Sequence, residues 1–183
     1  ALVECARQAI AAGELPAASD WFGRAWQEGC HGEAWVIEWV ELLVHLGDHA
    51  RADEIMQVHC VCAPGSSEGW FWRGYIQHVR GEYAPALVSY ERCVRLNPDR
   101  PMLANNLGAL YLEREDMMQA RQLLKRALVN DPRNVMAWTN YSTVLRLTGE
   151  LAAALIAVER ALALQPDYSI ALQAHANVLK ELQ

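Results

Sequence analysis

Apolar side chains recur along this chain with the spacing of amphipathic helices, and the helical runs come in pairs. In the clearest stretch, Leu107, Leu110 and Tyr111 mark one helical face. Residues 120–128 then carry apolar side chains at steps of three and four. A short break at 113–117 separates the two runs. The pattern predicts a helical hairpin here and, because it returns along the chain, an all-α fold.

The hairpin pattern returns with a fixed step of 34 residues. Three residue types keep this step, and an acidic residue follows each position of the first series. The series are Gly13, Gly47, Gly81, Glu115 (in place of glycine) and Gly149; Pro64, Pro98, Pro132 and Pro166; and Ala18, Ala52, Ala86, Ala120 and Ala154. Such a period is typical of a solenoid, in which each unit buries its apolar face by stacking on the next. We therefore expect a right-handed superhelical array.

The glycines and prolines predict where the helices end. Glycine suits a left-handed helix end, and the acid after it suits the start of the next helix. Asn97, Asp131 and Gln165 each precede a proline and should close second helices, because a residue before proline resists the helical conformation. Glu115 is interpreted as a tolerated substitution with no functional meaning.

The repeat resembles the tetratricopeptide repeat, whose pattern is Trp-x2-Leu-Gly-x2-Tyr, then Ala-x3-Phe, Ala and Pro. The two best copies carry most of this pattern, and the resemblance extends along the whole chain. Their matching residues are Leu107, Gly108, Tyr111, Ala120, Leu124, Ala127 and Pro132, and Trp138, Tyr141, Ser142, Leu145, Ala154, Val158, Ala161 and Pro166.

In this register the chain divides into five repeats and a tail. Repeat one (1–32) is degenerate, begins inside its own motif and has Cys30 in place of the closing proline. We therefore expect the chain to be an excerpt of a longer protein. Repeat two is also degenerate, whereas the next three are regular. The remaining ranges are 33–66, 67–100, 101–134, 135–168, and 169–183, which is either a capping helix or the first helix of a sixth repeat.

The resemblance implies that the first helix of each repeat lines a concave, peptide-binding groove. Counting one, four, five and eight places from each repeat's first residue, and in places a turn further, gives the expected lining. The expected groove residues are Glu38, Glu41, Phe71, Trp72, Tyr75, His78, Asn105, Asn106, Asn140, Thr143, Arg146 and Asn177.

Asn106 and Asn140 stand one period apart on this expected face. A side-chain amide donates to a carbonyl and accepts from an N–H, so an asparagine ladder can hold an extended peptide whatever its sequence. Similar ladders grip peptide backbone in tetratricopeptide proteins. The alternative is that both are ordinary solvated side chains.

Aromatic and acidic groups form two further candidate patches. Phe71, Trp72 and Tyr75 could anchor a partner or pack between repeats. Glu38 and Glu41 would favour a basic segment, unless they are an ordinary acidic surface. Arg73, where the family has leucine, should pair with one of these two acids. The remaining tryptophans are expected to be structural, namely Trp70 and Trp138 at the family's Trp position, and Trp21, Trp26, Trp35 and Trp39 in the first two repeats.

Composition excludes some classes of partner and indicates a cellular location. The net charge is −6, repeat two contributes −5 of it, and no basic stripe exists to neutralise phosphates, so nucleic acid is not expected. No uninterrupted apolar run reaches 18 residues, so direct membrane insertion is not expected. The chain has five cysteines, and an odd number cannot all form disulfides with one another. This favours a reducing, cytoplasmic location.

No motif predicts catalysis, a cofactor or a metal. Cys60-x-Cys62, preceded by His59 and, further back, by Cys30 and His31, has the wrong spacing for a zinc knuckle. The expected groove lacks the cluster of basic residues that clamps a terminal carboxylate, since the only lysines are Lys125 and Lys180 and Lys125 belongs to a second helix. The fragment is therefore interpreted as a non-catalytic module that binds an extended or helical protein segment. The alternatives are a substrate-recruiting region of a larger enzyme, such as a glycosyltransferase, and a scaffold that self-associates into a homo-oligomer.

Overall fold

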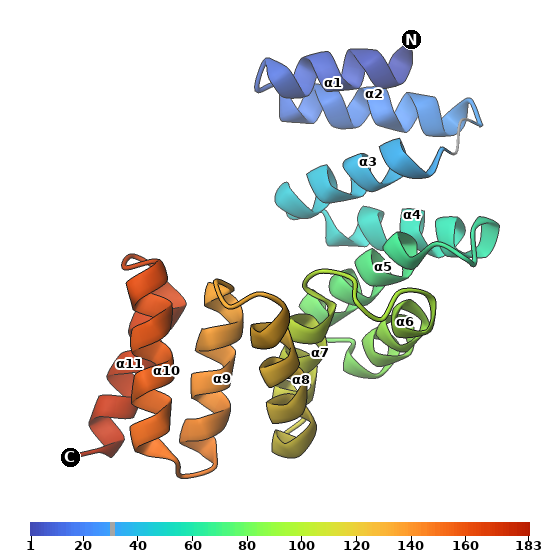
Figure 1. Ribbon diagram of the computed structural model, residues 1–183. Coiled ribbons are helices and arrows are strands. Elements are labelled where there is room, and N and C mark those ends of the chain that lie inside the picture. Colours follow the sequence, from blue (N-terminus) through green and yellow to red (C-terminus); the bar gives the residue numbers. More distant parts are fainter. Residues whose placement is uncertain (30–31) are drawn as a thin grey trace. The chain divides into compact units, whose positions relative to one another are not determined.

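The computed structural model describes residues 1–29 and 32–183, which form eleven α-helices and no strand (Figure 1). They make two compact units, unit 1 at Ala1–Asn97 and unit 2 at Pro98–Gln183. The all-α helical-repeat fold is confirmed. Unit 1 contains α1 (Leu2–Ala11), α2 (Leu15–Gln27), α3 (Glu33–His45), α4 (His49–Cys62), α5 (Ser67–Val79) and α6 (Tyr83–Leu96); unit 2 contains α7 (Leu103–Glu113), α8 (Met117–Asn130), α9 (Val135–Leu147), α10 (Leu151–Leu164) and α11 (Ser169–Glu181).

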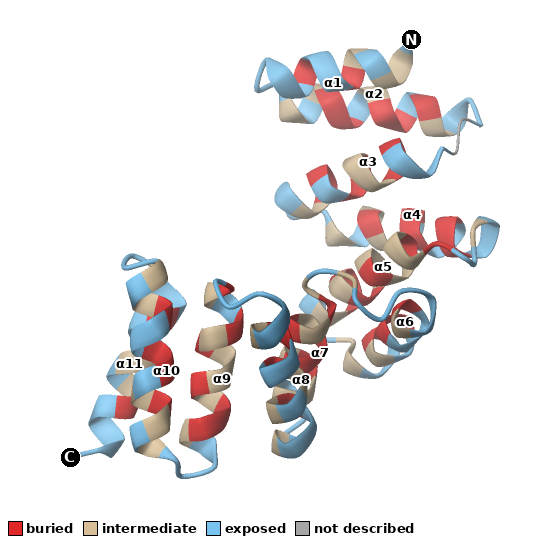
Figure 2. Ribbon diagram, viewed as in Figure 1, coloured by how far each residue is buried: buried red, intermediate tan, exposed pale blue. Residues whose placement is uncertain are grey.

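Small residues let the two helices of each hairpin approach closely. The alanines of the periodic series, from Ala18 to Ala154, are all fully buried. A Cβ at Gly74 would lie 2.7 Å from Cδ1 of Tyr90, and a Cβ at Gly108 would lie 2.7 Å from Cγ of Leu124. The buried residues follow stripes along the helices (Figure 2). Because packed interiors have little spare volume, these positions require small side chains.

The left-handed turns occur where the period places them. Gly13, Gly47, Gly81 and Gly149 have φ between 77° and 82°, and Glu115 adopts the same region with φ 59°. The following acid is the N-cap of the next helix in all five hairpins. Only the shorter aspartates form the side-chain bond: Asp48 accepts from the Arg51 N–H at 3.2 Å, and Asp116 from the Gln119 N–H at 3.1 Å.

The prolines close the second helices as predicted, and two tryptophans brace these turns. The residues before Pro98, Pro132 and Pro166 are extended and directly follow α6, α8 and α10. Trp70 Nε1 donates to the Pro64 carbonyl at 2.9 Å, and Trp138 Nε1 donates to the Pro132 carbonyl at 2.9 Å. Both indoles are half-buried. Their structural role agrees with the sequence prediction.

A cluster of aromatic rings fills the space between α2 and α3 in unit 1. Phe22 stacks on Trp35 with centroids 5.9 Å apart, and Trp39 lies 6.1 Å from Trp26. Trp39 is 2% exposed and donates from Nε1 to Ser19 Oγ at 3.2 Å. Trp21 packs partly buried at the edge of the same core. The N-terminal tryptophans therefore stabilise the degenerate repeats, as expected.

None of the helices in the described part of the chain combines the length and apolar character needed to cross a membrane. The last helix, α11, packs on α9 and α10. Ala171 and Val178 are its buried side chains, whereas Leu172 and Leu179 are 48% and 40% exposed.

Candidate functional site

Two of the expected groove residues, Phe71 and Asn105, face the helix packing, whereas their neighbours in the same expected lining reach solvent. Phe71 and Asn105 are buried, at 5% and 3% exposed, and the equivalent Thr139 is 2% exposed. The prediction that Phe71 and Asn105 line the groove was therefore wrong. The next residues, Trp72, Asn106 and Asn140, are half-exposed. Adjacent helix positions are about 100° apart around the axis, so the first set turns into the helix packing while the second reaches solvent.

Asn105 is nevertheless central to the candidate site in unit 2. Asn140 Nδ2 on α9 donates to Asn105 Oδ1 on α7 at 3.2 Å, and Asn105 Nδ2 donates to Asn106 Oδ1 at 3.2 Å. A buried amide thus joins the two half-exposed amides in one chain of hydrogen bonds. Because linked hydrogen bonds polarise one another and fix side-chain rotamers, this chain orients Asn106 and Asn140.

The outer amides of this chain keep free hydrogen-bonding capacity. Among the described residues, Asn106 accepts one bond and donates none, so both protons on its Nδ2 are available. Asn140 donates one bond, which leaves its Oδ1 and a second proton available. The pair can therefore offer N–H donors and a carbonyl acceptor, the two groups that a peptide backbone needs.

The neighbouring side chains on this face are partly committed to other partners. Thr143 Oγ1 donates to its own helix at the Thr139 carbonyl, at 3.1 Å. Arg146 Nη1 is 2.6 Å from Glu181 Oε1, so its charge is neutralised by α11. Gln173 Nε2 donates to Asn177 Oδ1 at 3.2 Å. Asn106 and Asn140 therefore keep more free hydrogen-bonding groups than these neighbours do.

In unit 1, Trp72 belongs more to the packing than to a free anchor site. Its ring meets Phe71 and Tyr75 edge to face, at 5.7 and 5.6 Å, and packs against the unit 1 core. Its Nε1 is buried and has no hydrogen-bond partner among the described residues. Tyr75 is half-exposed, and His78 contacts the ring of Tyr83 at 5.9 Å. A partner could reach only the outer edge of this aromatic group.

The acidic patch is neutralised by a different arginine from the one expected. Arg7 on α1 forms a two-pronged pair with Glu38, with Nε–Oε2 3.0 Å and Nη2–Oε1 2.8 Å. This pairing raises the pKa of Arg7 through the hydrogen bond and the charge of Glu38. Glu41 is exposed one turn further along α3. The acidic groups thus retain only part of the charge that the sequence suggested.

Glu38, one of the two acids expected to pair with Arg73, is held by Arg7 instead. The Arg73 guanidinium lies 5.6 Å from the centre of the Trp70 ring. It also interacts with the Cys60 thiol of α4 through its charge and a hydrogen bond. Burial raises the pKa of the Cys60 thiol to about 11, and the nearby Arg73 charge opposes this shift. Arg73 therefore faces the α4 side of α5.

The cysteine and histidine motif in α4 is split between the core and the surface. His59 and Cys60 are buried, whereas Cys62 is exposed. Across residues 1–29 and 32–183, no three His, Cys, Asp or Glu side chains are grouped as metal ligands would be. Cys30 and His31, the other residues of the considered zinc motif, lie outside the described residues.

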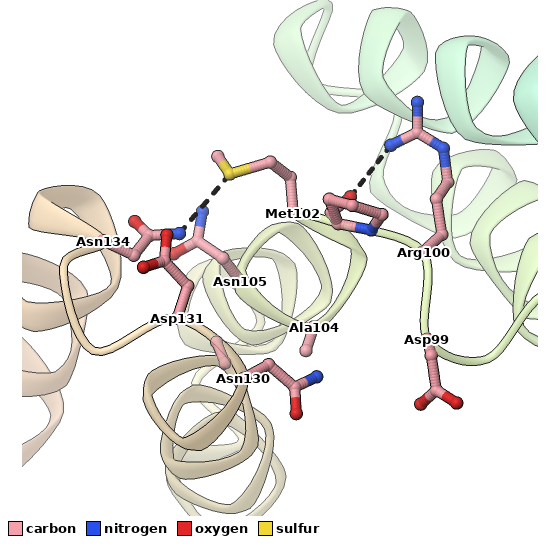
Figure 3. A pocket seen from close by; sticks show the side chains of 10 residues that line it. Asp99, Arg100, Met102, Ala104, Asn105, Asn130, Asp131 and Asn134 are labelled. Carbon is pink, nitrogen blue, oxygen red and sulfur yellow. Dashed lines mark hydrogen bonds between the residues drawn. The ribbon is translucent and has the colours of Figure 1, made fainter.

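The site also contains a pocket that the sequence interpretation missed. It lies in unit 2 beside the start of α7, and Asn105 and Ala104 are among its lining residues (Figure 3). Comparing Ala104 with Trp70 and Trp138, one period away on either side, could have pointed to it. Alanine at the position where the two neighbouring repeats have tryptophan is the feature of the sequence that indicates the pocket.

Known proteins share this repeat in sequence and fold. Tetratricopeptide repeat models match residues 67–100 and 105–169. The tetratricopeptide repeat-containing protein trd-1 of Caenorhabditis elegans is 32% identical over 93 residues, which are 51% of this chain and 12% of trd-1. Human protein O-mannosyl-transferase TMTC1 is 32% identical over 72 residues, or 39% of this chain and 8% of the transferase. The chain thus spans about a tenth of either relative.

A solved structure supports the same fold. YrrB, described as a tetratricopeptide repeat protein with an unusual peptide-binding site, superposes with a TM-score of 0.68 at 19% identity, covering 87% of this chain and 82% of YrrB. The two matched regions identify the helical hairpins as tetratricopeptide repeats, and the likeness to YrrB shows the same fold. The chain belongs to the tetratricopeptide repeat family, whose repeats indicate a protein–protein interaction module.

Proposed function

We propose that the first-helix face of unit 2 binds an extended peptide segment through its backbone. The observation that carries this proposal is the hydrogen-bonded chain Asn106–Asn105–Asn140, which leaves a donor group and an acceptor group on adjacent helices. The two outer amides are half-exposed, and the inner one is buried. A buried anchor that fixes exposed amides lowers the entropy cost of ordering them when a ligand binds.

Backbone recognition of this kind is tolerant of sequence. Every peptide unit offers one N–H and one carbonyl, so the amides would hold the segment while other contacts select it. Each added hydrogen bond contributes about 0.5–1.5 kcal/mol net. Two amides therefore give moderate affinity, and further specificity must come from side-chain pockets. The unusual peptide-binding site described for YrrB, which shares the fold, is consistent with this use of the helical array.

The proposal is tested with peptides selected from a random 12-residue display library on the immobilised chain. Affinities of the selected peptides are measured by fluorescence anisotropy for wild type and for Asn106→Ala with Asn140→Ala. We expect the double variant to bind about 5- to 2,000-fold more weakly, since two to three bonds of about 0.5–1.5 kcal/mol each are lost.

The matched control is Gln122→Ala, which removes an exposed amide from the second helix α8. This control should bind like wild type. Equal affinity of the double variant and wild type for every selected peptide would exclude the two amides as a backbone clamp.

A second candidate is that the array recruits protein substrates to an enzyme in a longer chain. The match to human protein O-mannosyl-transferase TMTC1 supports this hypothesis. It predicts that the genomic reading frame around this sequence encodes a transferase domain, and that adding the fragment in trans competes for the substrate. A reading frame without such a domain would exclude it.

A further inference from the structure

Repeat four lacks the tryptophan that occupies the same place in the repeats on either side. Trp70 and Trp138 are separated by two periods, and the residue midway between them is Ala104. In unit 2, Trp138 packs against a cluster that includes Ala161. The equivalent of Ala161 one period earlier is Ala127, which is 6% exposed. The volume of an indole is therefore missing next to Ala127.

A pocket of about 370 Å³ occupies this place in unit 2 (Figure 3). This volume falls within the range of about 300–1,000 Å³ that is usual for small-ligand sites. Both alanines line it, together with residues from the start of α7 and from the turn before α9. Among these residues are Met102, Asp131 and Asn134.

The start of α7 is altered in the same repeat, which helps to keep the pocket open. The N-caps Ser66 and Asn134 accept backbone N–H bonds at 2.8 and 2.9 Å, but the equivalent residue is Arg100, whose guanidinium cannot accept. Arg100 Nη1 instead donates to the Pro101 carbonyl at 2.9 Å. The helix therefore begins only after Met102, which takes a left-handed conformation with φ 65°.

The carbonyl that would receive the missing indole N–H is already in use. In the neighbouring repeats it is Pro64 or Pro132, and the equivalent here is Pro98. Arg126 Nη2 donates to the Pro98 carbonyl at 2.6 Å and to Asp99 at 3.0 Å. The turn is thus braced by Arg126 in place of a tryptophan, and the space above Ala104 is left for another group.

We propose that this pocket, named here the Ala104 socket, binds a tryptophan side chain from a partner protein. The protein's own Trp138 is the template for the occupant, because it fills the equivalent space one repeat later. The sulfur of Met102 lies at the socket and accepts a bond from Asn134 Nδ2 at 3.4 Å, and thioether sulfur packs favourably against aromatic rings.

The socket also offers an acceptor for the indole N–H. One oxygen of Asp131 accepts from the Arg133 N–H at 3.0 Å, and within the described chain the other oxygen accepts no bond. Asp131 is exposed, so this bond would replace one to water and contributes little by itself. The preference for tryptophan over leucine therefore rests on the larger volume that an indole fills and on its contact with the Met102 sulfur.

The probe for this proposal is N-acetyl-L-tryptophanamide, titrated into the 15N-labelled chain and followed by NMR. We expect saturable shifts of the Ala104 and Asn105 backbone amides, with a dissociation constant in the millimolar range or tighter. N-acetyl-L-leucinamide should bind about tenfold more weakly. Absence of saturable shifts at the socket, or equal binding of the two compounds, would overturn the proposal.

Two variants test the fit of the socket independently of ligand binding. Ala104→Trp should raise the melting temperature by a few degrees, because the side chain fills an existing space, and it should abolish the shifts. Ala104→Ser should keep both the melting temperature and the shifts. A lower melting temperature for Ala104→Trp would mean that the pocket does not match an indole and would contradict the proposal. The titration does not use the Asn106–Asn140 pair, so the two proposals can fail separately.

Discussion

Asn140 donates from Nδ2 to Oδ1 of Asn105 at 3.2 Å, which links the first helices of two consecutive hairpins in unit 2. Asn105 is 3% exposed, whereas Asn140 is half-exposed. The bond therefore joins the packed interior of the array to the face on which a peptide is proposed to bind. A substitution at the buried position 105 should therefore change the orientation of Asn106 and Asn140 on that face.

Replacing Asn105 with alanine tests this link. The change removes the acceptor of the Asn140 bond and the donor to Asn106, and leaves a small cavity. The free energy of unfolding should fall by about 1–3 kcal/mol, as for a disrupted buried hydrogen bond. Urea denaturation measures it. The exposed Gln122→Ala should change this free energy by less than about 0.5 kcal/mol; an Asn105→Ala protein as stable as that control would contradict a structural role for the bond.

Gly108 should not tolerate a methyl group. An added Cβ would lie 2.7 Å from the branch carbon Cγ of Leu124, so the two helices of the hairpin would have to move apart. We expect Gly108→Ala to lower the free energy of unfolding by about 1–3 kcal/mol. Gly65→Ala is the control, because nothing lies within 4 Å of its added Cβ. If both variants melt alike, the packing described for this hairpin is wrong.

Replacing Glu115 with glycine should stabilise the protein. Its φ of 59° is unfavourable for a residue with a side chain, whereas four equivalent turns use glycine. We expect Glu115→Gly to raise the free energy of unfolding by about 0.5–1 kcal/mol, after the greater flexibility of glycine in the unfolded chain is included. The reverse change, Gly149→Ala, should lower it by about 1 kcal/mol. Thermal melts of both variants should shift in opposite directions; shifts of the same sign would count against this account.

Cys60 and Cys62 should differ sharply in reactivity although they are two residues apart. Burial raises the pKa of the Cys60 thiol to about 11, so at pH 8 very little of it is thiolate, and the side chain is 2% exposed. Cys62 is exposed. Maleimide labelling at pH 8 with peptide mapping should modify Cys62 first and reach Cys60 only as the protein opens. Comparable initial rates at the two sites would show that α4 is not packed as described.

The periodic residues were sufficient to predict the helical fold and its turns. Gly81 and Pro98, for example, act through local backbone preferences, which sequence spacing reports directly. The exposure of first-helix residues was harder to predict, because adjacent positions such as Asn105 and Asn106 have similar chemistry and only packing decides which is buried. Glu38 pairs with Arg7 because α1 and α3, which are separated along the chain by α2, bring these two side chains together. Sequence spacing alone could not identify this pairing.

The Ala104 socket escapes sequence prediction for a different reason. The family pattern marks residues that are present, and a substitution to alanine at position 104 removes a side chain without adding chemistry. Comparison with Trp70 and Trp138 marks the position, but the structure is needed to show that the volume beside Ala127 stays empty. In a repeat protein, a large side chain that one copy lacks while both neighbouring copies keep it can therefore mark a site.

The most direct test of the peptide-binding claim is an NMR measurement on the side-chain amides of Asn106 and Asn140 in the presence of a selected library peptide. The Nδ2 proton resonances of both residues should shift on binding and exchange more slowly with solvent, because they enter hydrogen bonds with the peptide backbone. If the peptide binds while both resonances stay unchanged, the amide pair does not form the binding site and the proposed function is contradicted.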